Sequence, residues 1–395
     1  MICPEHSELQ ELVRDLHRQA TPWLPAGCGS RLDWGPAVQA GPGRSEPLVL
    51  STARLNRILR FSPEDFTVTV QAGTPLLVLQ QELAHHRQWL ALDWPWGSGP
   101  DGSASGSVGG LVARGLAGGA RQRYLGVRDQ LIGIGLLRAD GTAARAGGQV
   151  VKNVAGYDLM RLLTGSWGSL ALISELTLRT LPLPPERRGL WLQGPAAELA
   201  SMARWLLDSS LSPERIDWQQ SLSPSGPCPG LLLSLASISA QTLDEQIACI
   251  RERAPGLALD CLDADALRMR LGEGLGGGDS PSWLLRLGVR AAELAGLLHE
   301  PELAAIGWSF AAGSGLGMAW ADADQLADHQ VARLRRRCGE LGGHLTVLRQ
   351  PAGSRIPAWL DARSRPAIEA IKRQFDPKQQ LARGRLPGVA PGFPG

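Results

Sequence analysis

The sequence predicts an α+β protein built from two domains and a C-terminal segment. The 395 residues exceed the length of one ordinary domain. Hydrophobic residues make up 44% and charged residues 20% of the chain, as in a globular protein with a large core. Segments that alternate apolar and polar residues are mixed with segments of helical spacing, and prolines at 182, 184 and 185 separate two parts of different texture. We therefore expect a first domain over 1–186, a second over 187–360 and a terminal segment over 361–395.

The first part is expected to begin with an amphipathic helix over 8–18, because leucine and valine recur there at helical spacing. Strands are expected at 47–52 and within 66–76, with a short helix at 53–60 between them. Thr74 is the expected N-cap of a helix that runs to His85. The pair Asp140–Gly141 between two strand-like runs predicts a hairpin, and a long strand should end at the proline cluster.

Beyond residue 186, strand-like segments alternate with helical segments over 242–253 and 324–341. The strand-like segments read GLWLQG, GLLLSLASI and WLLRLGV. This alternation predicts a second, smaller α+β domain. A last helix should stop at Asp376–Pro377, and no internal repeat is evident in the sequence.

Charge and composition exclude several functions. The formal net charge is +2, and the arginine cluster at 333–337 is typical of a charged helix face, so no nucleic acid is expected as a partner. No apolar run reaches the ~18 residues of a membrane helix, and the polar start is unlike a signal peptide. We expect a cytoplasmic protein, either free or held at a membrane surface through its partners. The six cysteines are widely spaced, so reduced thiols are expected and no metal site.

Glycine-rich turns are the most informative local feature. Gly97, Gly99 and Gly102 form a GxGxxG pattern, but Pro100 interrupts it and no strand leads into it, so a Rossmann site is not favoured. Four glycine-rich turns, at 25–30, 97–110, 118–119 and 165–168, lie in the first part. Such turns can form backbone nests for a long ligand that carries a pyrophosphate. A chain with 48 glycines would contain such turns in any case, so both explanations stay open.

The segment over 150–175 places Lys152 and Tyr157 between glycines, although the chain has only two tyrosines. Two interpretations remain open at this point. The segment is either a tight loop before a buried helix, with Lys152 paired to Asp158, or one wall of a cofactor site.

Five motifs together resemble a known family. They are PAGCGS (25–30), SGSVGGLVA (105–113), RYLGVRDQLIGIGLLRADG (123–141), VVKNVAGYDLMRLLTGSWGSLALISELTL (150–178) and FDP (375–377). In this order they resemble the vanillyl-alcohol-oxidase family of flavoproteins, and within it the FAD-binding E subunits of glycolate oxidase. The resemblance covers about 20–185 well, the C-terminal helix moderately and the middle domain weakly. It implies a PCMH-type FAD-binding domain of two subdomains, a smaller α+β cap domain, and a C-terminal helix that packs on the FAD domain.

The resemblance also implies which residues hold FAD. The first glycine loop, which matches the pyrophosphate-binding loop, consists of Pro25, Ala26, Gly27, Cys28, Gly29 and Ser30. The turn that lines the diphosphate and the flavin is matched by Ser107, Val108, Gly109 and Gly110. Arg123 and Tyr124 match the family's RYG that precedes a strand, and Ile173 matches a residue whose backbone contacts the adenosine end. The residues expected beside the flavin are Lys152, Asn153, Gly156 and Tyr157, where a cation would stabilise the anionic reduced ring.

Some features depart from the family. Cys28 allows a covalent link to FAD, as in relatives that attach it through His or Cys, or is a small buried thiol. Relatives that oxidise 2-hydroxy acids themselves carry a histidine-rich motif, HxGDGNxH, which this sequence lacks. His85 and His86 lack a third ligand, so a metal is not expected there. His344 and Arg349 lie on one strand-like segment and are the candidate base and carboxylate-binding cation, with a structural role as the alternative for His344.

The expected function is that of the FAD-binding subunit of a glycolate oxidase complex, which converts glycolate to glyoxylate. Expected partners are a larger flavoprotein D-type subunit and an iron–sulfur subunit that receives the electrons. Two alternatives remain: a non-catalytic structural or assembly subunit, and a self-sufficient FAD-dependent dehydrogenase of a D-lactate-like 2-hydroxy acid.

Overall fold

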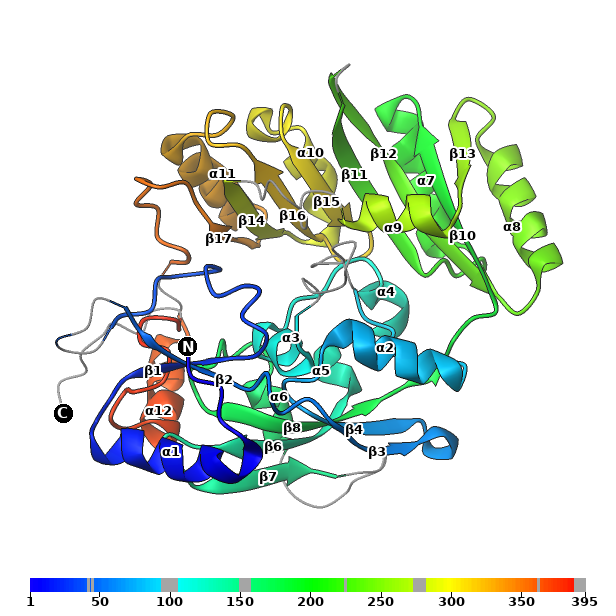
Figure 1. Ribbon diagram of the computed structural model, residues 1–395. Helices are drawn as coiled ribbons and strands as arrows, with labels where there is room; N and C mark the ends of the chain where they lie inside the picture. Colours follow the sequence, from blue (N-terminus) through cyan, green and yellow to red (C-terminus); the bar gives the residue numbers. More distant parts are fainter. Residues whose placement is uncertain are drawn as a thin grey trace.

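A computed structural model describes residues 1–40, 43, 46–93, 106–148, 158–223, 226–272, 282–360 and 363–386. Figure 1 shows two parts stacked on one another. The lower part contains the N-terminus, a five-stranded sheet and helix α12, and the upper part is formed around an eight-stranded sheet.

The five-stranded sheet of the lower part is antiparallel, in the order β3-β4-β8-β6-β7. Its strands are β3 Ile58–Ser62, β4 Thr67–Gln71, β6 Leu131–Leu137, β7 Ala143–Gly147 and β8 Leu172–Arg179. The helices that share its core are α2 Leu76–His85, α3 Val108–Arg114, α5 Val127–Gln130 and α6 Leu159–Leu163. Because β6 is buried along most of its length, its sequence, LIGIGLL, consists of apolar residues and glycines instead of a clean alternation.

A second core in the lower part lies around the first helix, α1 His6–Arg18. Its apolar face packs against a parallel pair of short strands, β1 Trp23–Ala26 and β2 Leu48–Ser51, and against the ends of β6 and β8. A two-stranded ribbon, β5 Gln88–Trp89 with β9 Leu181–Pro182, closes the lower part next to the proline cluster.

Several local expectations can be compared with this part. The hairpin at Asp140–Gly141 is confirmed, because Gly141 has a positive φ of 78° and Arg138 N donates to Thr142 O at 3.0 Å. The short helix over 53–60 is wrong: the chain turns there and enters β3, which pairs with β4. Thr74 is not an N-cap, since helix α2 begins at Leu76 and no side-chain bond caps it.

The upper part is an antiparallel sheet in the order β13-β10-β12-β11-β15-β16-β14-β17. Its first four strands along the chain are β10 Glu186–Gln193, β11 Arg215–Ser223, β12 Gly226–Ser237 and β13 Ala258–Leu262. The other four are β14 Trp283–Gly288, β15 Gly307–Ala311, β16 Leu316–Ala321 and β17 His344–Arg349. The helices between them are α7 Ala196–Asp208, α8 Ala240–Arg253, α9 Ala264–Gly272, α10 Leu294–Leu298 and α11 Asp328–Glu340.

This sheet contains the same βαββαβ unit twice. In each unit the fourth strand pairs with the first, the first with the third, and the third with the second. The two second strands, β11 and β15, pair with each other and join the units. The sequence showed no repeat because the duplication is one of topology: α7 has 13 residues and α10, its counterpart, has five.

The two faces of the upper sheet differ. One face packs on α7, α8, α10 and α11 through two large apolar clusters. The opposite face meets the lower part, where Leu284, Met318 and Trp320 pack against Trp34 and Trp167. We refer to this contact as the seam. Because alternate side chains of β14 point to opposite faces, Leu285 and Leu287 belong to the helix-covered core and Arg286 belongs to the seam face.

Helix α12, Arg365–Phe375, returns the chain to the lower part. Ile371, Phe375 and Leu386 pack against the main core there. Lys372 is buried and donates to Ser169 O at 2.7 Å, to Asp376 Oδ2 at 2.6 Å and to Leu381 O at 2.9 Å. The expected return of the C-terminal helix is thus confirmed. The division at residues 186 and 360 remains a prediction, which the two separate sheets support.

Candidate functional site

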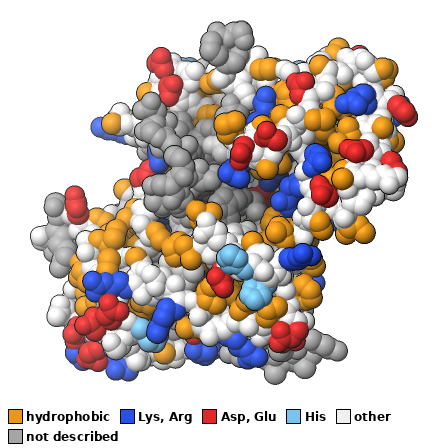
Figure 2. Space-filling model, turned by 45° about the vertical axis from the view of Figure 1, so that its right-hand side comes forward, with side chains coloured by type: hydrophobic (Ala, Val, Ile, Leu, Met, Phe, Trp, Pro, Cys, Tyr) orange, Lys and Arg blue, Asp and Glu red, His pale blue; other side chains and the backbone are white. Residues whose placement is uncertain are grey.

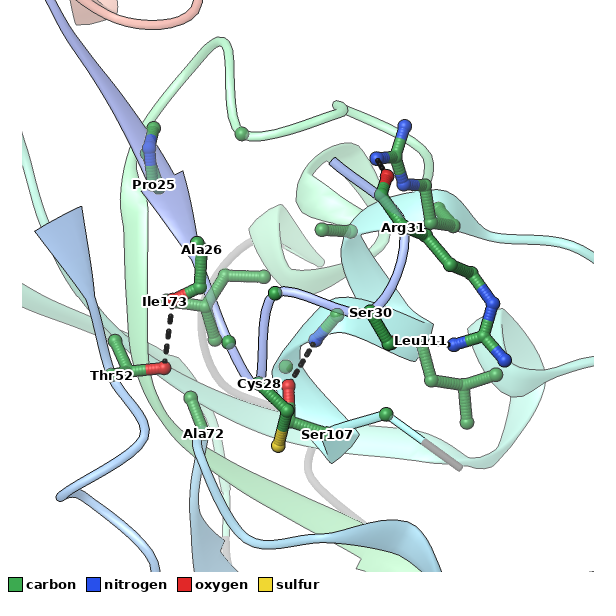
Figure 3. A pocket seen from close by; sticks show the side chains of 18 of the residues that line it. Pro25, Ala26, Cys28, Ser30, Arg31, Thr52, Ala72, Ser107, Leu111 and Ile173 are labelled. Carbon is green, nitrogen blue, oxygen red and sulfur yellow. Dashed lines mark hydrogen bonds between the residues drawn. The ribbon is translucent and has the colours of Figure 1, made fainter. Parts of the chain in front are cut away.

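A cavity opens in the lower part where three segments meet. The loop after β1, the end of β4 and the first turn of α3 line it together with 167–173 (Figure 3). The space between the atoms is ≈ 1060 Å³, counting the portion open to solvent.

The loop after β1 is held against α3 by a close approach that only glycine permits. A Cβ at Gly27 would lie 1.8 Å from Ser107 Oγ. Gly29 has a φ of 78°, which favours glycine. Within the described part of the chain, no hydrogen bond uses the backbone N–H groups of Cys28, Gly29 or Ser30. Three successive N–H groups without an acceptor form a nest that suits an anion.

The first turn of α3 forms the opposite wall. Ser107 is the N-cap and accepts a hydrogen bond from Gly110 N at 3.1 Å. Gly109 lies on the end of β4, where its N–H donates to Ala72 O at 2.7 Å and a Cβ would meet Ala72 Cβ at 2.7 Å. Glycine at 109 is therefore required for α3 to approach the sheet this closely.

Three arginines converge on this cavity, and the sequence reasoning missed them. Arg31, Arg114 and Arg385 all line it. Burial lowers the pKa of Arg31 to about 10 and that of Arg385 to about 10. Burial, followed by the charges of Arg385 and Arg31, holds the pKa of Arg114 well below its ordinary value. Asp33 is the carboxylate that acts on all three, so positive charge is in excess.

The arginines are fixed by backbone carbonyls and by one ring. Arg114 donates to Trp34 O at 3.2 Å and to Arg31 O at 2.5 Å, and its guanidinium lies 4.0 Å from the Trp167 ring centroid. Arg385 donates to Pro36 O at 3.2 Å and also to Leu32 O. No local motif surrounds these arginines, and 271 residues separate Arg114 from Arg385, so only the folded chain reveals the cluster.

These features fit the diphosphate of FAD. A bound diphosphate would accept from the free N–H groups of the loop and would compensate the crowded guanidinium groups. The predicted residues that line the cavity are Pro25, Ala26, Gly27, Cys28, Gly29, Ser30, Ser107, Gly109, Gly110 and Ile173.

Other predicted residues lie elsewhere. Val108 is fully buried in the main core and does not line the cavity. Arg123 and Tyr124 line a different groove, where the Tyr124 hydroxyl donates to Glu214 at 2.6 Å. Lys152, Asn153, Gly156 and Tyr157 lie outside the described residues, as does the GxGxxG pattern. Their roles therefore stay predictions.

Cys28 is exposed at the cavity, with its Sγ 3.8 Å from Gly73 O. Desolvation raises the pKa of its thiol, and Arg31 opposes this shift. A protonated thiol is a poor nucleophile, so the structure gives no support to a covalent link through Cys28.

The eight-stranded sheet of the upper part, which we call the cap sheet, presents a second set of polar and charged side chains at the seam. Arg286 lies on β14 and is partly buried, and within the described residues its side chain has no hydrogen bond or ion pair. Burial, followed by the charge of Arg121, lowers its pKa. The pKa of His344 is lowered by burial and by Arg286, although the residue is exposed at the start of edge strand β17. Arg349, the predicted cation, instead forms an ion pair with Asp33 at 2.6 Å.

A buried charge network joins the cavity to the cap sheet. Asp93 lines the cavity and accepts from Gly118 N at 2.6 Å and Ala120 N at 2.9 Å. Arg215 on β11 bonds to Asp93 and, at 2.5 Å, to Asp217. Burial raises the pKa of Asp217, while the two carboxylates raise that of Arg215 against the effect of burial.

Residues 1–147 match the sequence family described as an FAD binding domain. The lower part of the molecule is accordingly an FAD-binding domain of the PCMH type, FAD is its cofactor, and the cavity lies within it. A solved structure of alkyldihydroxyacetonephosphate synthase has a TM-score of 0.68 with this chain at 14% identity, and covers 98% of this chain and 77% of that one. Because the match covers 98% of this chain, the two proteins share the fold of the cap sheet as well as that of the FAD-binding domain.

The most informative relatives share the FAD-binding half. The glycolate oxidase subunit GlcE of Escherichia coli is 36% identical over 50% of this chain and 54% of its own length. The D-2-hydroxyglutarate dehydrogenase of Xanthomonas citri is 35% identical over 49% of this chain and 38% of its own. A D-lactate dehydrogenase of Anaerostipes hadrus is 32% identical over 45% of this chain and 35% of its own. The chain thus spans about half the length, or less, of the curated relatives it matches.

Two structural features are absent from the residues that the structure describes. No helix there is both long and apolar enough to cross a membrane. Across the same residues, no group of three His, Cys, Asp or Glu side chains has the arrangement of a metal site.

Proposed function

We propose that this protein is the FAD-binding subunit of a complex that oxidises a small 2-hydroxy acid, with glycolate as the first candidate. The single observation that carries the proposal is the position of Arg286. This unpaired cation lies on the seam face of the cap sheet, and the same seam contains Trp167 and Leu116 of the cavity wall. A 2-hydroxy acid needs a cation for its carboxylate beside the flavin, and Arg286 together with Arg121 supplies one.

The other requirement is a base for the hydroxyl proton. His344 is within the electrostatic reach of Arg286, and burial, followed by the charge of Arg286, lowers its pKa, which favours the neutral imidazole that can accept a proton. FAD, when bound, supplies the acceptor for the two electrons and the remaining hydrogen of the carbinol carbon. Arg349 is less suitable than Arg286, because Asp33 already neutralises it.

The relatives support the choice of reaction and leave its details to experiment. Their names join glycolate, D-lactate and D-2-hydroxyglutarate, which are all 2-hydroxy acids. The names of two relatives describe subunits of glycolate oxidase, which supports a complex with a larger flavoprotein D-type subunit. We further propose that an iron–sulfur subunit takes the electrons and that the complex is cytoplasmic or peripheral to a membrane.

The test uses the full chain reconstituted with FAD and purified with its partners. Turnover of glycolate and D-lactate is measured with a dye acceptor for the unchanged protein, Arg286→Met and Arg290→Met. Arg290 is the matched control, since it lies four residues away, is exposed and, among the described residues, forms an ion pair with Glu293 alone. We expect Arg286→Met to raise the KM by about 10- to 100-fold with unchanged flavin content, as for the loss of a charged hydrogen bond. Equal KM values for both variants, or a chain that takes up no FAD, would contradict the proposal.

A further inference from the structure

A second groove lies where the link between β8 and β10 passes from the lower to the upper part. Its space is ≈ 1280 Å³, counting the portion open to solvent. The floor is made by Pro182, Pro184 and Pro185, and the sides come from α4 Arg121–Tyr124 and from the end of β12. This groove is separate from the FAD cavity, with which it shares no lining residue.

Two large apolar side chains on the walls of the groove are exposed to solvent. Ile238 is 88% exposed and Leu125 is 58% exposed. Leu125 also has φ 65° and ψ −167°, a region that almost only glycine adopts. A leucine in this strained conformation, with its side chain exposed to solvent, does not stabilise the folded chain. Burial of both side chains under another protein would remove their apolar surface from water, which is favourable.

The buried carboxylate of the groove, Glu214, already has its hydrogen-bond partners. Glu214 accepts from Tyr124 Oη at 2.6 Å, from Arg187 Nε at 2.7 Å and from Ser234 Oγ at 2.8 Å. The Arg187 guanidinium also lies 4.5 Å from the Trp89 ring centroid. A preformed floor of this kind reduces the entropy lost on binding.

The rim is positively charged. Arg123 and Arg179 line the groove, and Arg87 adjoins it through its carbonyl, which accepts from Leu183 N at 2.8 Å. All three are exposed, and none has an ion pair within the described residues. Asp129 is the one uncompensated carboxylate in the lining, and it already accepts from Gly126 N at 3.1 Å. The occupant should therefore carry carboxylates beside its apolar side chains.

We propose that this groove binds an extended segment of a partner subunit, with apolar side chains over Leu125 and Ile238 and acidic side chains against Arg123 and Arg179. The inference rests on the proposed function only in expecting a complex. The occupant is a segment of a different, acidic protein, because acidic side chains match the positive charge of the rim. A second copy of this chain is a poorer match, since its formal net charge is +2.

The first experiment places photo-crosslinking p-benzoylphenylalanine at 125 or 238 of the full chain in its host. The control position is 59, because Leu59 is 44% exposed on the outer strand β3. Peptides crosslinked from 125 and 238 should come from one segment of one partner, rich in apolar and acidic residues, and should be absent from 59. Crosslinks to a second copy, to lipid, to scattered proteins or to nothing would each overturn the proposal.

The second experiment separates docking from a structural role. Leu125→Gly removes the backbone strain, so the thermal unfolding temperature should stay unchanged or rise, while the crosslink yield from 238 falls about tenfold. A leucine with a merely structural role would give the opposite result, lower stability with an unchanged yield. Flavin content and acid oxidation are measured on the same samples. If oxidation is absent while the crosslinks persist, the proposed function fails and the docking groove stands.

Discussion

Adding one methyl group at residue 27 tests the geometry of the FAD cavity most directly. In Gly27→Ala, the new Cβ would lie 1.8 Å from Ser107 Oγ and 2.9 Å from Ser107 Cβ, where ordinary contacts are 3.4–4 Å. Rotation of Ser107 would relieve the first contact but would remove its hydrogen bond to Gly110 N, the cap of α3. The second contact remains whichever rotamer is adopted.

The magnitude follows from these two contacts. Loss of the cap costs about 1 kcal/mol, and the residual overpacking costs about 1–3 kcal/mol. The free protein can escape both by moving the loop over 27–30 away from α3. Binding of FAD then requires the loop to return, so a cost of about 2 kcal/mol raises the Kd for FAD by about 30-fold.

The assay is titration of the apoprotein with FAD, followed by quenching of flavin fluorescence, together with urea unfolding. The double variant Gly27→Ala/Ser107→Gly removes the atoms that collide, and it should recover about 1–3 kcal/mol relative to the sum of the single changes. Gly339→Ala serves as the control, because a Cβ there meets nothing within 4 Å. An additive double variant would show that the loop and α3 do not meet as described.

Two further predictions concern charged groups. Binding of ADP, followed by calorimetry, should weaken about 10-fold or more in Arg385→Met, because this change removes one of the three guanidinium groups that line the cavity; an unchanged Kd would contradict the role of the cluster. Lys372→Met leaves Asp376 buried without its cation and should lower the free energy of unfolding by about 3–5 kcal/mol. Lys372→Met/Asp376→Asn should recover part of this loss in the same urea titration, and no recovery would mean that the pair is not the cause.

The sequence was sufficient to single out two loops that line the cavity, because the geometry of these loops is local. Gly27, Gly29 and Gly109 each serve a turn or a close approach whose chemistry can be recognised within a few residues. The same reasoning assigned Val108 to the cavity, although in a helix the neighbours of a lining residue point elsewhere, and Val108 points into the core.

The cap and its cations could not be predicted in the same way. Arg286 sits in the strand-like segment WLLRLGV, where one arginine among apolar residues gives no sign of which face is the seam. The seam face of the sheet can be identified only once Trp34 and Trp167 of the lower part are seen to pack against it. The sequence favours Arg349 as the carboxylate-binding cation because it lies close to His344 along the chain. Its ion pair with Asp33, which lies 316 residues away, is visible only in the folded chain.

The network of Asp93, Arg215 and Asp217 explains how these distant parts form one site. Asp93 binds the turn at Gly118 and lines the FAD cavity, while Arg215 and Asp217 belong to a central strand of the cap sheet. Gly119 is the reason that the contact can form, since a Cβ there would lie 2.0 Å from Asp217 Oδ1. Opening of the cap would break the ion pair between Asp93 and Arg215, which is stronger between buried groups than at a surface. Under the proposed function, a substrate would therefore reach Arg286 along the seam instead of through a hinged opening.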